Sequence, residues 1–324
     1  MRLQDNNELI DRIRLKQQLL AKGDDSHKNI RLLYMFDGGV MSGVFAGGVG
    51  VGMLESTIHA DDGTPVSLFD TADTLVGCSA GTPPILYGLS RQSFLGYTIY
   101  PDKLSGNKFV NLKRAWRMVD INYLVNIFRT GERSLNLQRL LSSRSKAYTV
   151  LTHVKTGEKE IFDLKNEKAL HLLELAITTP IVSGLKLVDT REYVDGFILP
   201  IKKIIEKFNP TDVVLVLNSP IGSHASEGPG LLDKTIGNIM GKVLHPKLRD
   251  SFLYRHGEFQ TNMSFFENLP STHNINIGVL APHKHHIGRF EKSVDKIRNA
   301  GIEGAKTVLN IFAPHKKDEI LKKM

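Results

Sequence analysis

The chain has 324 residues, of which 41% are hydrophobic and 23% are charged, an ordinary globular composition with ample material for a core. Its formal net charge of +8 favours anionic partners, such as a membrane surface or a nucleic acid. A single cysteine, Cys78, excludes an intramolecular disulfide framework and fits a reducing compartment.

The first segment of the chain predicts an amphipathic helix. Its opening residues are too polar for a signal peptide, so we expect a cytoplasmic protein that contacts membranes, if at all, from the surface. Between residues 5 and 22, leucines and isoleucines recur at helical spacing among charged residues, and Gly23 ends the pattern. We expect residues 1–30 to form a helical extension that packs on the main domain; docking on a membrane or a partner is the alternative.

A strand, a glycine-rich turn and a helix are expected next. Residues 31–36 form a compact apolar run, residues 37–43 are rich in glycine, and residues 44–54 are apolar and dense in glycine. Backbone N–H groups in such a turn can bind a phosphate or an oxyanion. A dinucleotide site is disfavoured because no acidic residue ends an obvious second strand, and the apolar run is too short for a membrane span.

A candidate nucleophile lies in residues 74–84. Residues 77–81 fit the pattern G-x-S-x-G, with a short apolar run before them and a Thr-Pro-Pro sequence after them that suits a first helical turn. A serine between a strand and a helix is presented outward on a sharp, strained turn. Ser79 is therefore either a nucleophile or an incidental serine in a glycine-rich turn. We expect its neighbour Cys78 to be a buried filler on the strand.

The rest of the chain alternates between strand and helix patterns. Residues 100–145 are basic and mixed, and they either cover an active site or pack as ordinary helices. Beyond them we expect a hairpin at 147–153 and 159–163, a helix at 168–176, strands at 212–217 and 274–280, and helices within 289–311. This alternation predicts an α/β fold with a central, mostly parallel sheet. We expect one domain, residues 31–312, and a basic C-terminal tail at 313–324.

Four of these segments together resemble the patatin-like phospholipases. Residues 37–49 resemble the family's glycine-rich oxyanion segment, and residues 77–81 resemble its nucleophile motif. Residues 176–180 resemble a family segment rich in small residues and closed by proline, and residues 193–196 (Tyr-Val-Asp-Gly) resemble its Asp-Gly motif. The four motifs occur in the family's order. The resemblance implies a three-layer patatin-like fold in which helices flank the central sheet.

The resemblance also implies a serine–aspartate dyad. Ser79 would attack an ester carbonyl, and Asp195 would accept its proton and later return it to the leaving alcohol. Backbone N–H groups of Gly38, Gly39 and Val40 would face the oxyanion of the tetrahedral intermediate. Neither a metal nor another cofactor is required. Without the other motifs, Asp195 would be interpreted as a solvated aspartate in an Asp-Gly turn.

Three positions depart from the family's pattern. Val40 stands where a third glycine is usual, Ser42 stands where arginine or lysine is usual, and Phe197 replaces the small residue that follows Asp-Gly. If the loop keeps the family's backbone path, Val40 is strained, because valine is poorly suited to positive φ. Loss of the basic residue removes a fixed charge near the oxyanion. These departures leave the fold prediction intact and weaken the prediction of full activity.

The expected function is that of a lipid acyl hydrolase of the phospholipase A or lysophospholipase type. We expect a phospholipid or lysophospholipid substrate, with monoacyl or neutral esters as alternatives. The positive net charge predicts peripheral contact with an anionic membrane surface. A nucleic-acid partner is not expected, because the chain has neither a nucleic-acid motif nor aromatic residues interleaved with a basic cluster.

Two rival functions stay open. One is an esterase with a Ser-Asp-His triad, whose histidine would come from the four that follow Asp195 in suitable order: His273, His283, His285 and His286. Three of these also suggest a metal site, but only His283 and His285 share a strand face, which favours a solvated loop. The other rival is a weakly active or non-catalytic lipid-binding protein that keeps the fold.

Overall fold

The structure is a computed structural model that describes residues 2–114, 117–184, 192–222, 228–284 and 287–324. Its strands are β1 (Leu32–Phe36), β2 (Thr57–His59), β3 (Pro65–Ser67), β4 (Thr74–Cys78), β5 (Lys146–His153), β6 (Lys159–Asp163), β7 (Tyr193–Asp195), β8 (Asp212–Val216) and β9 (Asn276–Leu280). Its helices are α1 (Asn7–Ala21), α2 (Val44–Glu55), α3 (Leu68–Thr71), α4 (Thr82–Leu89), α5 (Ser93–Ile99), α6 (Ile121–Arg129), α7 (Leu137–Ser142), α8 (Ala169–Ala176), α9 (Ile201–Phe208), α10 (Leu231–Val243), α11 (Pro246–Leu253), α12 (Arg255–His273), α13 (Val294–Phe312) and α14 (Lys317–Lys323).

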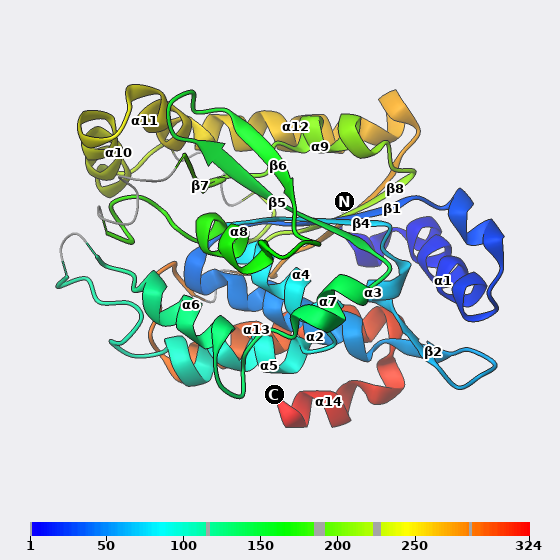
Figure 1. Cartoon of the computed structure of the whole chain (residues 1–324). Coiled ribbons are helices and arrows are strands. Elements are labelled where there is room, and N and C mark those ends of the chain that lie inside the picture. The colour runs from blue at the N-terminus through cyan, green and yellow to red at the C-terminus, as the bar shows by residue number, and fades with distance from the viewer. Residues whose placement is uncertain (1, 115–116, 185–191, 223–227, 285–286) are drawn as a thin grey trace.

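One large sheet runs through the molecule, and most of its pairings are parallel (Figure 1). The strand order is β6-β5-β4-β1-β8-β9, and β7 also pairs with β5. The four pairs from β5 to β9 along this order are parallel, whereas β6 and β7 run antiparallel to β5. The hairpin predicted from the sequence is formed by β5 and β6. Because parallel strands end at one edge of a sheet, the loops after β1, β4 and β8 meet there.

Helices cover both faces of the sheet, which gives three layers (Figure 1). The core on one face includes Leu33 and Met35 of β1 and is covered by α9 and α12. The core on the other face includes Leu32, Tyr34 and Phe36 of the same strand and is covered by α2, α4 and α13. Side chains alternate between the faces of a strand, so a strand covered on both faces must be apolar throughout. The predicted α/β fold with a flanked, mostly parallel sheet is confirmed.

The glycines of α2 allow its backbone to touch that of α13. A Cβ atom on Gly48 would lie 1.8 Å from the backbone oxygen of Gly301. A Cβ atom on Gly304 would lie 2.1 Å from the backbone oxygen of Phe45. Neither position has room for a side chain, because protein interiors are close-packed. The glycine-dense run after the first strand is therefore a surface for helix packing directly behind the loop at residues 37–43.

Both termini of the described chain pack on this body. Leu9 and Ile13 of α1, and Ile320 of α14, are buried in the same core as the sheet. That core is continuous across residues 30 and 312, and the division of the chain at these positions stays a prediction. Among the described residues, no helix combines the length and the apolar character that crossing a bilayer requires.

Candidate active site

Ser79 stands on a sharp turn between β4 and α4, as the motif predicts. Its backbone φ is +51°, a region that residues other than glycine rarely adopt. A Cβ atom on Gly77 would lie 2.7 Å from Cα of Thr82, and one on Gly81 would lie 2.2 Å from the backbone oxygen of Phe36. Both glycines of the G-x-S-x-G pattern are therefore required by close packing. The expected strand, turn and helix are present around Ser79.

The strand β5 brings Asp195 beside Ser79. Cys78, the last residue of β4, lies opposite Val150, and Asp195, the last residue of β7, lies opposite Leu151. Since β6 occupies the other edge of β5, β4 and β7 share one edge and meet end to end. Adjacent residues of a strand are about 3.3 Å apart, so the residue after Cys78 comes next to Asp195. Cys78 itself is fully buried, as expected of a strand filler.

Hydrogen bonds fix the Asp195 carboxylate against Ser79. The Ser79 hydroxyl donates to Oδ2 of Asp195 at 2.9 Å, and the Thr179 hydroxyl donates to the same oxygen at 2.7 Å. The Phe197 N–H donates to Oδ1 at 2.9 Å, and the Asp195 N–H donates to the Thr178 carbonyl at 3.1 Å. No role was predicted for Thr179 from the sequence. The pattern that could have indicated it is the segment of small residues closed by proline at 176–180, in which it lies.

Burial makes this carboxylate a stronger base. Asp195 is 3% exposed, and this burial raises its pKa, although its hydrogen bonds and the charge of Arg255 act in the opposite direction. The alternative of a solvated turn aspartate is wrong, because the side chain is enclosed at the end of β7. A Cβ atom on Gly196 would lie 2.6 Å from the backbone oxygen of Val150. The Asp-Gly pair therefore lets β7 end in close contact with β5.

Asn218, just after β8, orients the glycine loop. Its Nδ2 donates to the carbonyls of Asp37 at 2.6 Å and Gly38 at 3.2 Å, and its Oδ1 accepts from the Ala46 N–H at 3.1 Å. In a trans peptide, the following N–H points away from the carbonyl. Asn218 thereby turns the N–H groups of Gly38 and Gly39 away from itself. The sequence analysis missed this residue, whose signal was a polar side chain just beyond a buried parallel strand.

Ser42 anchors the next peptide of the same loop. Its hydroxyl donates to the Gly39 carbonyl at 2.8 Å, and its N–H donates to that carbonyl at 3.1 Å. The Val40 N–H belongs to the same peptide and points away from that carbonyl, so the two bonds also fix its direction. Burial raises the pKa of the Asp37 carboxyl to about 6, and the Gly38 N–H beside it acts in the opposite direction. Asn218 and Ser42 thus fix the directions of all three predicted oxyanion donors.

Backbone strain is concentrated around the loop and the nucleophile. Val40 has a φ of +54°, as expected if the loop keeps the resembled family's path, and Phe197 has a φ of +60°. With Ser79, these residues line one cavity. A residue in a disfavoured backbone region costs about 1–3 kcal/mol and persists where its surroundings hold it in place. Such strain is characteristic of functional sites.

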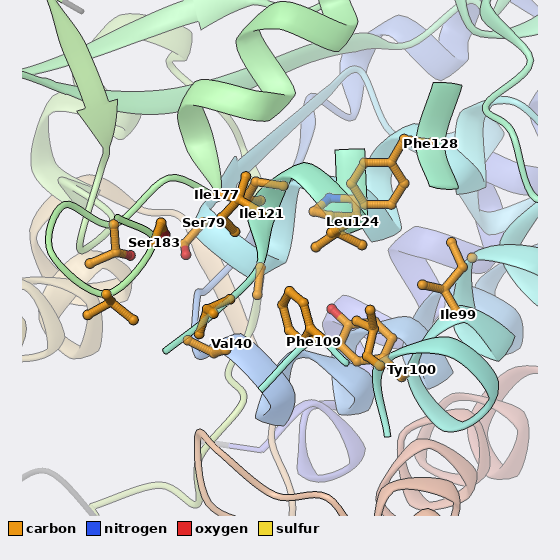
Figure 2. Close-up of a pocket in the computed structure, with 17 residues that line it drawn as sticks. Val40, Ser79, Ile99, Tyr100, Phe109, Ile121, Leu124, Phe128, Ile177 and Ser183 are labelled. Carbon is orange, nitrogen blue, oxygen red and sulfur yellow. The ribbon is translucent and has the colours of Figure 1, made fainter. Parts of the chain in front are cut away.

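An apolar pocket begins at Ser79 (Figure 2). It holds about 590 Å³, including its open mouth and the solvent there. Figure 2 shows Ser79 at one end and Ile99 and Phe128 at the other, with Phe109 and Leu124 between them. Much of this lining comes from the region 100–145, which therefore forms a wall of the site: Tyr100, Leu104, Phe109, Val119, Ile121, Leu124 and Phe128.

A second, wider cavity also reaches Ser79 and Asp195. It holds about 1740 Å³, including open solvent, and its wall contains Asp233, Arg255 and His256. Nη2 of Arg255 lies 2.8 Å from Oδ2 of Asp233, and Nε2 of His256 lies 3.3 Å from the same atom. Burial alone would raise the pKa of Asp233, but the His256 hydrogen bond and the Arg255 charge lower it to about 2. The sequence analysis assigned no role to these three residues.

The histidines considered for a triad are placed unfavourably where they are described. His273 ends α12 just before β9, so it lies at the amino-terminal edge of the sheet, opposite Ser79. His283 follows β9 at the correct edge, but it is exposed and lines neither cavity. His285 and His286 lie outside the described residues. Within the described parts of the chain, no three His, Cys, Asp or Glu side chains gather to hold a metal.

Sequence comparison identifies no relative of this chain. No protein-family model matches it, and no curated protein matches it. Among solved structures, the crystal structure of VipD from Legionella pneumophila is similar, with 11% sequence identity and a TM-score of 0.42. The match covers 88% of this chain and 67% of that chain.

Proposed function

We propose that the protein is a lipid acyl hydrolase of the phospholipase A or lysophospholipase type. The observation that carries the proposal is the 2.9 Å hydrogen bond from the Ser79 hydroxyl to Asp195, at the point where an apolar pocket and a wide, partly charged cavity meet. A nucleophile hydrogen-bonded to a buried base is the arrangement of covalent acyl transfer. The four motifs that resemble the patatin-like phospholipases support the same chemistry.

In the proposed reaction, Ser79 Oγ attacks the ester carbonyl carbon while Asp195 takes the hydroxyl proton. The carbonyl electrons move to oxygen, and N–H groups of Gly39 and Val40, with that of Gly38, stabilise the oxyanion. When the C–O bond breaks, Asp195 gives the proton to the leaving alcohol, and the acyl group stays on Ser79. A water molecule then attacks the acyl-enzyme, Asp195 takes its proton, and the freed Ser79 oxygen regains that proton as the acid leaves.

The two cavities divide the substrate. The apolar pocket suits the acyl chain, because each buried methylene contributes about 0.8 kcal/mol. The wide cavity suits the alcohol part, and the exposed, cationic Arg289 in its wall favours an alcohol that carries a phosphate. A phospholipid or lysophospholipid is therefore the proposed substrate class. Faster hydrolysis of a neutral monoacyl ester would assign the cavity to an uncharged alcohol.

Covalent labelling tests the proposed function directly. We expect a fluorophosphonate to label the wild-type protein at Ser79 and to leave Ser79→Ala unlabelled, with both proteins equally folded. Mass spectrometry of the labelled peptide identifies the site. A folded wild-type protein that takes up no label and hydrolyses no ester would contradict the proposal and favour a non-catalytic lipid-binding protein.

The rate of ester hydrolysis is expected to fall at acidic pH. Asp195 must be ionised to accept the proton, and its burial raises its pKa. The acid limb of kcat/KM should therefore lie above the ordinary aspartate value of about 3.9. The Asp37 carboxylate, with a pKa of about 6, repels that of Asp195. Replacing it in Asp37→Asn should lower the pKa of Asp195 and move the limb to lower pH.

A soluble short-chain ester, assayed from about pH 4 to about pH 9, measures this limb in both proteins. Unfolding at the acidic end is checked by circular dichroism at each pH. A limb at the ordinary aspartate value in the wild type would exclude a buried carboxylate as the base.

A further inference from the structure

Exposed leucines lie at the entrance to the wide cavity. Leu231 is 83% exposed and Leu232 is 51% exposed, although both belong to the first turn of α10 and line the cavity that reaches Ser79. Leu112 is 53% exposed, and Phe109, three residues before it, lines the apolar pocket. Two adjacent exposed leucines at a cavity that leads to Ser79 indicate an interaction surface.

Two further segments border the cavities, and hydrogen bonds hold them to each other and to the oxyanion loop. The Gly106 N–H donates to the Lys292 carbonyl at 3.3 Å, and Nζ of Lys292 donates to Oδ1 of Asn107 at 2.8 Å. The Met41 N–H, in the oxyanion loop, donates to the Arg289 carbonyl at 3.2 Å. Residues 103–114, residues 287–293 and the first turn of α10 thus border the two cavities, and we call them together the rim.

Two lysines of the rim carry uncompensated positive charge. Lys108, Lys113 and Arg289 are exposed. Among the described residues, no carboxylate lies within ion-pair distance of Lys108 or Lys113, and Asp120, the next acid along the chain, is paired with Arg117 at 2.7 Å. Basic side chains beside exposed leucines fit a surface that is anionic outside and apolar beneath, which describes an anionic lipid layer.

We propose that the rim docks the protein on an anionic lipid surface, with Leu231 and Leu232 inserted among the acyl chains and Lys108 and Lys113 against the phosphates. The choice of a lipid surface rests on the proposed function. A lipid ester stays in its layer, so the cavities that lead to Ser79 must open toward that layer. Residues of the rim line both cavities, and the charge of its lysines complements the layer.

Vesicle binding tests this docking. The full-length chain is sedimented with vesicles of ether-linked lipids, which contain no carboxylic ester, carrying either phosphatidylglycerol or only phosphatidylcholine head groups. We expect the wild type to prefer the anionic vesicles and to lose affinity as salt rises. The double variant Leu231→Ser with Leu232→Ser should bind the anionic vesicles about tenfold more weakly. Lys108→Gln with Lys113→Gln should lose about tenfold at low salt and little at high salt.

Matched controls separate the rim from the rest of the surface. Leu15→Ser removes a leucine that is 47% exposed on α1, at the other end of the molecule from α10 (Figure 1). Lys322→Gln with Lys323→Gln removes two positive charges from α14, the same change in net charge as the rim variant. Both controls should bind vesicles as the wild type does. Both controls and the rim lysine variant, whose residues line neither cavity, should hydrolyse a soluble short-chain ester at the wild-type rate, and circular dichroism checks that the leucine variant is folded.

Five outcomes would overturn the docking proposal. Wild-type protein could bind both vesicle types equally or not at all, or the α14 control could lose as much affinity as the rim lysine variant. Unchanged vesicle binding by the leucine variant would also overturn it, and a dimer that this variant dissociates would instead assign the rim to a second copy of the chain. Failure of the proposed function gives a different result: vesicle binding as expected, but no ester hydrolysis and no fluorophosphonate label.

Discussion

Replacing Asp195 with asparagine is expected to lower kcat/KM for a soluble ester by about four powers of ten, as much as Ser79→Ala does. The two side chains act as one unit, because Ser79 is a weak nucleophile until its proton can pass to Asp195 at 2.9 Å. The amide of the introduced asparagine cannot accept that proton, whereas its shape is nearly that of the carboxyl group.

The same variant should remain folded and be at least as stable as the wild type near neutral pH. The asparagine oxygen can accept from the Phe197 N–H, and its amide can donate to the hydroxyls of Ser79 and Thr179, which then act as acceptors. Burial raises the pKa of Asp195 above its value in the unfolded chain. The folded state therefore loses stability as pH rises from the unfolded pKa through the folded pKa. Removing the charge in Asp195→Asn should recover that stability above the folded pKa and give no gain below the unfolded pKa.

Kinetics and thermal unfolding of Ser79→Ala, Asp195→Asn and His256→Ala separate a dyad from a triad. His256 lines the same cavity as Asp195, and its substitution should change kcat/KM less than about tenfold for a soluble ester. Equal losses in His256→Ala and Asp195→Asn would establish a histidine in the mechanism. A lower melting temperature for Asp195→Asn near pH 8 would show that the carboxylate stabilises the fold.

Replacing Asn218 with alanine is expected to lower kcat about 100-fold with little change in KM, the usual cost of losing one oxyanion donor. Asn218 touches neither the nucleophile nor the base in the described contacts. It binds the carbonyls of Asp37 and Gly38 and thereby directs the N–H groups of Gly38 and Gly39. Without this anchor the two peptides can rotate, and the donors lose their fixed direction toward the oxyanion. Asn218 is therefore a positioning residue.

A pair of inhibitors distinguishes positioning from a loss of stability. A trifluoromethyl ketone, which adds to Ser79 and forms an oxyanion, should bind Asn218→Ala more weakly by the same factor as kcat falls. The corresponding methyl ketone should bind both proteins equally. Asn262→Ala is the matched control, because Asn262 is also buried and donates to a carbonyl, that of Leu199, at 3.0 Å. Unchanged binding of the trifluoromethyl ketone by Asn218→Ala would refute the positioning role.

Local patterns in the sequence were sufficient for most strands of the large sheet, for several helices and for one half of the candidate site, but not for α10, α11, α12 or the hairpin of β2 and β3. Strands such as β1 and β8 are continuous apolar runs because both faces of the sheet are covered, and this can be recognised without knowing the partner strands. The turn at Ser79 is equally local, since its two glycines and the helix that follows lie within a few residues. The positive φ at Val40 was predictable from the resemblance of the loop to a family that has glycine there.

The other half of the site was decided by tertiary structure alone. Asp195 meets Ser79 because β4 and β7 pair with neighbouring positions of β5, Val150 and Leu151, and no local pattern encodes a register between segments so far apart. The same holds for Asn218, which contacts the glycine loop through the pairing of β8 with β1. Sequence periodicity specifies which face of an element is buried, but contacts between distant elements depend on how the chain packs, and the apolar pocket and its rim exist only in the packed fold.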